Sequence, residues 1–494
     1  MSRPVPPSSP DTWPFSCQVT GGGRGLAVRH GRQRVAELAF GLPGEPVPGF
    51  TPDEDEVRLT RAEAFTARLR HTPDATGWVS TVSLDNHTDA ERALPPLGVA
   101  VTLAPAWVGW SWSSDTEGFI VCAPAAGTGP CLLVGVRRGF FRAAQSAPVF
   151  LAADRRGEGL GAGVAAFHLA HPTGSLRPLG RHVTTLEFSS IATVDAAASQ
   201  LPAWLPDLLV APRDEMVLRT PDLGVTPGAG VDLTTVGTDA LVTGEPGHRE
   251  LAVHGVRGVQ RLRLSFTPEA GSLVMDLAAE RLETRPGGSA SSAAAVVAGA
   301  LAHGLTPEPE RALDWLERED WLGRGDVWGP AISGVIAQET RDPDLLRAAC
   351  DAVAAADYVP GLAVIGTRLW WGTLRAGLPP FALTDVFDRA TDDPLAQLEN
   401  AVLRNLPEER WGAVASGFVN RLGGGLPGQP VGLSEADAGL AIALLRMVPE
   451  HWAVRRAATQ ASEKAEALLL CDHADRLHPA LDGLAWLLMG EIGS

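Results

Sequence analysis

Three tryptophans and five carboxylates fall within the eighteen-residue stretch Leu313–Pro330. Flat indole rings can cover the C–H face of a pyranose, and paired carboxylates can give and take protons at a glycosidic bond. We therefore expect sugar chemistry here, with Asp320 and Asp326 as acid and base candidates and Glu317 and Glu319 in reserve. Such carboxylates act without a cofactor, so none is expected.

The remaining residues of this stretch suggest how a sugar would be held. Gly323 and Gly325 interrupt a helical pattern, which predicts a helix–loop–helix turn. Trp321 and Trp328 would then stack on the substrate, and Arg324 would bind an anion or lower the pKa values of the neighbouring acids. The competing interpretation is a helical corner with core tryptophans, solvated acids and a surface Arg–Asp network.

A second aromatic and acidic cluster lies nearer the N-terminus. Trp110 and Trp112 are two residues apart, so on a strand they point to the same face. With Asp115 and Glu117 directly after them, they predict a saccharide-stacking platform on the rim of a sheet. The alternative is a row of core aromatics between two sheets.

Composition restricts the possible partners. The net charge of −17 argues against nucleic acid and against anionic membrane surfaces, because both require clustered positive charge. The five cysteines show no metal-ligand spacing, so no metal site is expected. Cys122 and Cys131 could face each other across a hairpin, although free thiols in a reducing cytosol are the simpler expectation. Residues 1–11 form a Pro/Ser-rich tail without a signal-peptide pattern, which predicts a cytoplasmic protein.

The elements that must position these residues change type along the chain. Residues 12–205 alternate between short apolar runs and turn signals such as Asp85-Asn86, which predicts a large antiparallel β-sandwich. Residues 206–285 predict a small immunoglobulin-like β-sandwich, whose last strand is expected at Ser272–Leu277. The helical period from 286 to 494 predicts antiparallel helix pairs, arranged as an α/α toroid or a curved array. Ser434 and Asp437 have the spacing of a capping box.

The β-then-α order resembles glycoside hydrolases and phosphorylases that combine a β-supersandwich with an α/α toroid. A local likeness lies in VGWSWSSDTE, Val108–Glu117, and in CLLVGVRRG, Cys131–Gly139. These segments resemble the supersandwich of α-galactosidase-type enzymes. Those enzymes carry their catalytic aspartates in a (β/α)8 barrel, and no eightfold β/α alternation occurs here. The resemblance therefore implies a carbohydrate-active protein without placing catalytic residues.

Two hypotheses follow. The first is hydrolysis or transfer at a glycosidic bond of a saccharide, by carboxylate acid/base chemistry. The second is a non-catalytic binding or assembly protein, whose sandwiches and helical array contact a partner protein or a second copy of the chain. A closed helical ring with a central acidic, tryptophan-lined pit would favour the enzyme, and an open curved array with a flat apolar patch would favour partner binding.

Overall fold

The computed structural model of the protein describes most of the chain. The described residues are 13–20, 24–41, 56–60, 64–74, 77–95, 97–144, 164–219, 224–255, 258–288, 290–423, 433–476 and 480–490. The expected tail, residues 1–11, lies outside them. The chain divides into two compact units, Met1–Leu208 with Glu215–Thr243 and Arg249–Leu264, and Leu209–Asp214 with Gly244–His248 and Ser265–Ser494.

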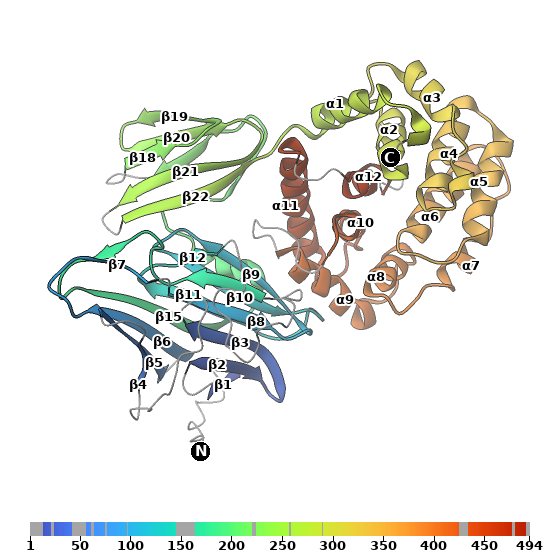
Figure 1. The fold of residues 1–494 in the computed structure, drawn as a ribbon. Helices are drawn as coiled ribbons and strands as arrows, with labels where there is room; N and C mark the ends of the chain where they lie inside the picture. The colour runs from blue at the N-terminus through green and yellow to red at the C-terminus, as the bar shows by residue number, and fades with distance from the viewer. Residues whose placement is uncertain are drawn as a thin grey trace. The chain divides into compact units, whose positions relative to one another are not determined.

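Two antiparallel sheets form most of the first unit (Figure 1). The six-stranded sheet has the order β1-β2-β3-β8-β13-β12, with bounds β1 Phe15–Thr20, β2 Gly25–His30, β3 Gln33–Gly41, β8 Gly98–Leu103, β13 Val164–His168 and β12 Arg142–Ala143. The seven-stranded sheet has the order β4-β5-β6-β15-β11-β10-β9, with bounds β4 Glu56–Thr60, β5 Phe65–Asp74, β6 Gly77–Asn86, β15 Arg181–Ile191, β11 Cys131–Arg138, β10 Gly118–Pro124 and β9 Trp107–Ser113.

The two sheets share one apolar core, to which Leu26 and Leu38 of the first sheet and Leu69 and Val134 of the second contribute. Buried and less buried positions alternate along β5, as expected when one face of a strand meets the core. The predicted antiparallel β-sandwich is therefore confirmed.

Cys122 and Cys131 do not face each other. In the β10–β11 ladder Cys122 lies opposite Leu132, so Cys131 points to the other face of the sheet. Cys122 belongs to the core between the sheets, and both thiols are free. Their register excludes the hairpin contact that the sequence left open.

Three smaller sheets are also found among the described residues. β7 (Arg92–Ala93) pairs with β14 (Ser175–Leu176). A four-stranded sheet has the order β16-β22-β21-β18, with bounds β16 Leu209–Val210, β22 Gly258–Phe266, β21 Gly247–Gly255 and β18 Gly224–Pro227. A three-stranded sheet has the order β17-β20-β19, with bounds β17 Met216–Arg219, β20 Asp239–Gly244 and β19 Val231–Val236. The domain boundaries expected from the sequence remain predictions.

Twelve α-helices are found in the described part of the second unit. The first six are α1 Ala270–Leu282, α2 Ser291–Ala302, α3 Pro309–Glu317, α4 Trp328–Thr340, α5 Pro343–Ala355 and α6 Leu362–Arg375. The others are α7 Leu383–Phe387, α8 Pro394–Leu403, α9 Glu408–Arg421, α10 Glu435–Arg446, α11 Arg455–Ala474 and α12 Asp482–Met489. The predicted β-then-α fold class is confirmed, but residues 272–277 lie in α1. Leu273, Val274, Leu277 and Ala278 have the helical spacing that the strand interpretation overlooked.

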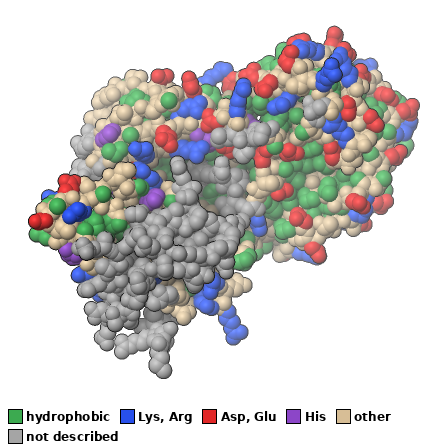
Figure 2. Space-filling model, in the orientation of Figure 1, with side chains coloured by type: hydrophobic (Ala, Val, Ile, Leu, Met, Phe, Trp, Pro, Cys, Tyr) green, Lys and Arg blue, Asp and Glu red, His purple; other side chains and the backbone are tan. Residues whose placement is uncertain are grey.

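The even-numbered helices contact one another in order, and α12 also packs against α2 (Figure 1). This contact closes the α/α arrangement into a ring, so a toroid is formed and not an open array. The closure requires small residues: a Cβ on Gly299 would lie 2.7 Å from Leu488 Cβ, and a Cβ on Gly439 would lie 2.4 Å from the Gly483 carbonyl oxygen. On the face shown in Figure 2, hydrophobic side chains gather over the middle of the helical unit.

Local signals start several of these helices. The Ser434 hydroxyl accepts the N–H of Asp437, and the Asp437 carboxylate accepts the N–H of Ser434, which confirms the predicted capping box. Asp342 and Asp393 cap α5 and α8, and a proline follows each of them at the first helical position. Among the described residues, no helix is long and apolar enough to cross a membrane.

Candidate functional site

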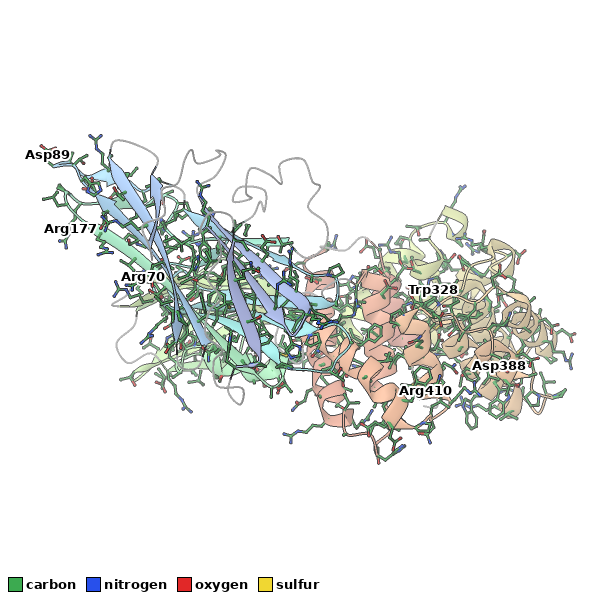
Figure 3. The ribbon with its side chains drawn as sticks, turned by 90° about the horizontal axis from the view of Figure 1, so that it is seen from below. Arg70, Asp89, Arg177, Trp328, Asp388 and Arg410 are labelled. Carbon is green, nitrogen blue, oxygen red and sulfur yellow. The ribbon has the colours of Figure 1, made fainter. Side chains whose placement is uncertain are left out.

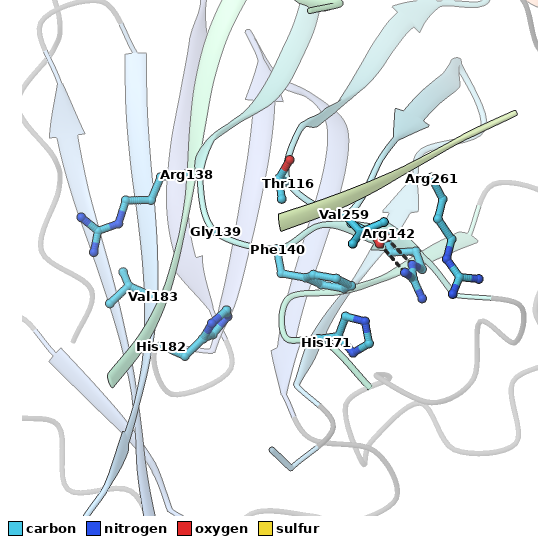
Figure 4. Close-up of a pocket in the computed structure, with 11 residues that line it drawn as sticks. Thr116, Arg138, Gly139, Phe140, Arg142, His171, His182, Val183, Val259 and Arg261 are labelled. Carbon is cyan, nitrogen blue, oxygen red and sulfur yellow. Dashed lines mark hydrogen bonds and ion pairs between the residues drawn. The ribbon is translucent and has the colours of Figure 1, made fainter. Parts of the chain in front are cut away.

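A cavity of about 690 Å³ lies in the first unit, where turns of the sandwich meet β22 (Figure 4). Three arginines, two histidines and one aspartate line it, namely Arg138, Arg142, Arg261, His171, His182 and Asp115. Three fixed positive charges therefore face one negative charge, in a chain whose net charge is −17. We call this the cationic pocket. Its lining favours an anionic ligand.

Asp115 fixes the position of Arg142. The Arg142 Nε and Nη2 atoms donate to the two carboxylate oxygens of Asp115, which is the bidentate geometry that suits a planar guanidinium. Asp115 adopts φ 68°, a left-handed conformation that Asp tolerates better than most residues. This turn also lets its carbonyl accept the N–H of Phe141 at 2.8 Å, so the turn and Arg142 are held together.

Arg138 and Arg261 are not neutralised in this way. Neither has a hydrogen-bond or ion-pair partner among the residues that the structure describes. Both side chains are exposed, and Figure 4 shows Arg261 beside Arg142, with Arg138 on the other side of Phe140. Two uncommitted guanidinium groups in one cavity are available to bind carboxylate, sulfate or phosphate oxygens.

The floor of the pocket is fixed by Thr184. Its Oγ1 donates to the Leu169 carbonyl at 2.8 Å and accepts the N–H of Phe140 at 3.1 Å. Gly139 makes this approach possible, because it has φ 108° and a Cβ there would lie 2.4 Å from Thr184 Oγ1. The Phe140 ring lies under Arg142, 5.3 Å from the guanidinium carbon, and gives the pocket an apolar surface.

His182 is held as a neutral imidazole with one open nitrogen. Its Nε2 lies 2.8 Å from the Leu169 carbonyl oxygen, and a carbonyl can only accept, so Nε2 carries the hydrogen. Burial lowers the pKa of His182 and the nearby Arg138 adds to this, while the hydrogen bond to Leu169 opposes both. Nδ1, which has no partner among the described residues, is therefore free to accept a proton.

His171 has the complementary arrangement. Its Nδ1 accepts the N–H of Thr173 at 3.2 Å, so in the neutral ring the hydrogen is on Nε2. The ring meets Phe140 edge-on, with centroids 5.2 Å apart. The cationic pocket thus contains one imidazole that can accept a proton and one that can donate a hydrogen bond.

The predicted stacking platform contributes one residue to this pocket. Asp115 lines it, whereas Trp110 is buried with 5% of its surface exposed and Trp112 is partly buried. Trp110 is therefore not available to a ligand, and Glu117 is not part of the lining. Sequence reasoning missed the arginines and histidines. A signal was present in Arg137-Arg138-Gly139-Phe140-Phe141-Arg142, a basic and aromatic run in an acidic chain.

The acids predicted to be catalytic lie in the helical unit. Glu317, Glu319 and Asp320 line a second cavity of about 540 Å³, and we call it the acidic pocket. Asp320 accepts the N–H of Gly323 at 3.0 Å, which closes a local turn. Asp326 does not line this pocket; its Oδ1 accepts the N–H groups of Trp328 and Gly329 at the start of α4.

The tryptophans of this stretch are sealed in the ring. Trp321 borders the acidic pocket but is only 1% exposed, and Trp328 is 5% exposed, so the expectation that they stack on a substrate is wrong. Trp321 donates from Nε1 to the Leu316 carbonyl at 2.8 Å, and Trp328 packs on Trp486 with centroids 4.3 Å apart. Figure 3 shows Trp328 among the helices.

Arg324 packs against Trp321 and pairs with Glu319. Its guanidinium lies over the Trp321 ring at 4.4 Å and pairs with Glu319 at 3.2 Å. It is therefore occupied within the corner between α3 and α4, and does not bridge Asp320 and Asp326.

A Ser–His–Asp chain occurs elsewhere in the second unit. Ser265 Oγ lies 2.9 Å from His248 Nδ1, and His248 Nε2 lies 2.7 Å from Asp472 Oδ1. Ser265 is only 5% exposed on β22, so a substrate carbonyl has no approach to its hydroxyl. We interpret this chain as a buried polar connection between β21, β22 and α11.

Comparison with known proteins gives a fold and no family. No protein-family model matches the chain, and no curated protein matches it. A solved structure described as Polysaccharide Lyase BACCELL_00875 superposes with a TM-score of 0.54 at 11% identity, over 93% of this chain and 82% of the other. A TPR-domain containing protein from Parabacteroides distasonis is also matched, with a TM-score of 0.16 that carries no argument. The chain therefore shares its β-then-α fold with a polysaccharide lyase.

Proposed function

We propose that this chain is a carbohydrate-active protein that binds an acidic polysaccharide in the cationic pocket and cleaves it by elimination. The observation that carries the proposal is the presence of Arg138 and Arg261, without acidic partners among the described residues, in one cavity of a strongly acidic chain. The shared fold with a polysaccharide lyase supports a polysaccharide as the ligand.

The pocket suits a uronate, a sugar whose ring carries a carboxylate. Arg142, positioned by Asp115, and Arg261 beside it in Figure 4 can bind that carboxylate. The Phe140 ring is buried beneath Arg142 and supports that guanidinium at the wall of the pocket. A neutral polysaccharide would leave the guanidinium groups unused, so the pocket favours charged chains.

The chemistry balances without an added reagent. A base removes the hydrogen from the carbon next to the carboxylate, and the C–H electron pair becomes a C=C bond. The C–O bond at the following carbon breaks, and the departing oxygen keeps its electron pair and gains a proton from an acid. No water is consumed.

The residues of the pocket have matching roles in this scheme. His182 Nδ1 is the proton acceptor, and the His182 imidazolium that results returns this proton to the departing oxygen, toward which His171 Nε2–H donates a hydrogen bond. The arginines stabilise the negative charge that grows on the carboxylate as the proton leaves. A lowered pKa keeps His182 neutral and able to act as a base near pH 7.

The test is incubation with polygalacturonate, alginate and hyaluronate while ultraviolet absorbance and new reducing ends are both followed. Elimination produces a conjugated C=C–carboxylate that absorbs in the ultraviolet, together with one reducing end per cut. His182→Ala is expected to abolish both signals. If no acidic polymer on this panel binds or is cut, the proposal fails.

Glycosidic hydrolysis at the acidic pocket is the second candidate, because three predicted acids line one cavity there. Glu319 is paired with Arg324 and Asp320 closes a turn, while Glu317 has no partner among the described residues. Hydrolysis would give reducing ends without the ultraviolet signal, and Glu317→Gln would abolish them. The ring is closed, but Trp321 and Trp328 are buried in it, so only one part of the criterion for an enzyme is met.

A further inference from the structure

Asn86, the last residue of β6, is a buried polar junction that lines neither the cationic nor the acidic pocket. It is 2% exposed, and its amide is fully engaged. Nδ2 donates to the carbonyls of Ala90, Leu176 and Arg177 at 2.9, 3.0 and 3.1 Å. Oδ1 accepts the N–H of Thr88 at 3.0 Å and its hydroxyl at 2.8 Å.

These partners belong to two loops that are far apart in the sequence. One runs from residue 87 to 95 and the other from 169 to 180, and Figure 3 shows Asp89 and Arg177 at the same end of the sheets. The backbone continues the junction, since the N–H of Asn86 donates to the Gly180 carbonyl at 3.0 Å. The loops then pair as β7 and β14.

The second loop carries His171 into the cationic pocket. The His171 carbonyl accepts the N–H of Gly174 at 3.0 Å, and the Gly174 carbonyl accepts the N–H of Leu94, from the first loop, at 2.8 Å. The position of the His171 ring therefore depends on how the two loops are joined. Asn86 joins the two loops through its side-chain hydrogen bonds. It also lies two residues after Leu84, which pairs with His182 in the β6–β15 ladder.

We propose that Asn86 is a positioning residue that sets the tautomer and placement of His171 in the cationic pocket. An amide is required because one oxygen must accept while one nitrogen donates to carbonyls. Asp at this position would accept from Thr88 but would repel the three carbonyl oxygens, and Ala would leave five polar groups without this partner. The chemical role of His171 rests on the proposed function; its positioning by Asn86 does not.

The test uses the full chain with ¹⁵N-labelled histidine. Nuclear magnetic resonance distinguishes a ring nitrogen that bears hydrogen from one that accepts, and His171→Gln identifies the His171 signal. The wild type is expected to show the Nε2–H tautomer of His171. Asn86→Ala is expected to give a mixed tautomer and roughly tenfold faster amide exchange in residues 171–177, with the His182 signal unchanged.

Two further variants make the result specific. Asn86→Asp keeps the side-chain size and the bonds to Thr88, so it is informative even if Asn86→Ala fails to fold. Amide exchange should become faster in residues 171–177 and stay slow in residues 87–88. Ser175→Ala removes only the exposed bond from Ser175 to Glu91 between the same loops and should leave the His171 tautomer unchanged.

Binding of oligogalacturonate gives the functional readout. Asn86→Asp is expected to weaken it about tenfold, because a displaced group near the reacting atoms loses its contact. If His171 keeps its tautomer and its loop keeps its protection in Asn86→Asp, the inference is overturned. If the tautomer changes but the wild type binds no acidic saccharide, the positioning role stands and the proposed function fails.

Discussion

The hydroxyl of Tyr358 donates to the carboxylate of Glu399 across 2.6 Å inside the helical ring. Glu399, on α8, also accepts the N–H groups of Gly361 and Val364 at 3.0 and 2.7 Å, so one buried side chain caps the start of α6. Burial raises the pKa of Glu399 to about 7, and the hydrogen bonds it accepts oppose that rise.

This pair predicts a pH-dependent stability of the second unit. The folded pKa lies above the unfolded value of 4.5, so the contribution is complete below pH 4.5 and is lost as pH rises through 7. The loss is at most about 3 kcal/mol of unfolding free energy. Urea unfolding at pH 5 and pH 8 should show this difference in the wild type and in exposed Glu409→Gln, but not in Glu399→Gln. Equal pH slopes in all three proteins would contradict it.

Gly361→Ala should destabilise the ring strongly. Gly361 has φ 95°, and a Cβ there would lie 2.1 Å from the Trp486 ring. Backbone strain and overpacking together predict a loss of about 3 kcal/mol or more. Gly304→Ala is the matched control, because Gly304 has φ 67° with no atom within 4 Å, so only about 1 kcal/mol of strain is expected. Similar losses in the two variants would show that the contact with Trp486 is not limiting.

Arg261→Gln should weaken binding of oligogalacturonate about tenfold, because one charged hydrogen-bond partner is removed. Calorimetric titration measures this, with the methyl-esterified oligomer as the uncharged ligand, whose weaker binding should not change. Arg213→Gln removes an exposed arginine that pairs with Glu269 and is not one of the residues that line the pocket, so it serves as the control. Equal affinity of wild type and Arg261→Gln would remove Arg261 from the site.

Asp115→Asn tests the ion pair with Arg142 independently of the backbone turn at residue 115. Asn also tolerates φ 68°, so the turn should persist while the bidentate contact with Arg142 is lost. Because Arg142 keeps some solvent contact, we expect a loss of about 1–2 kcal/mol in stability and weaker oligogalacturonate binding. Thermal unfolding and titration check the two effects; unchanged binding would mean that Arg142 needs no orienting partner.

Asp326→Ala should act through helix α4. Its Oδ1 accepts two backbone N–H groups at the helix start, so its removal should cost about 1 kcal/mol of stability. Cleavage of polygalacturonate should be unaffected in both Asp326→Ala and Asp320→Asn. If a folded Asp320→Asn variant no longer cleaves polygalacturonate, the catalytic site is in the acidic pocket and not in the cationic pocket.

Periodicity alone was enough to predict the β-then-α order and the capping box at Ser434, because both depend on residues close in sequence. The register of β10 and β11, which separates Cys122 from Cys131, could not be read in this way. It depends on which strand face meets the core, and that is decided by contacts across the sandwich.

The cationic pocket could not be predicted from the sequence for a related reason. Asp115, Arg142, His171, His182 and Arg261 are spread over almost 150 residues, and only the strand order brings them together. The tryptophans, in contrast, lie close together in the sequence but led to a wrong prediction of a sugar-stacking surface. Indole suits a helical core and a sugar face equally well, so the density of Trp321 and Trp328 in the sequence carried no information about exposure.

The contact between α12 and α2 also bears on the order in which the helical unit can be built. During synthesis, α2 emerges nearly two hundred residues before its partner, with eleven of its twelve residues destined to be buried. Until Asp482–Met489 arrive, Gly299 and its neighbours lack their cover. We therefore expect a chain without Asp482–Met489 to leave the apolar, alanine-rich face of α2 around Gly299 uncovered, which favours aggregation and proteolysis.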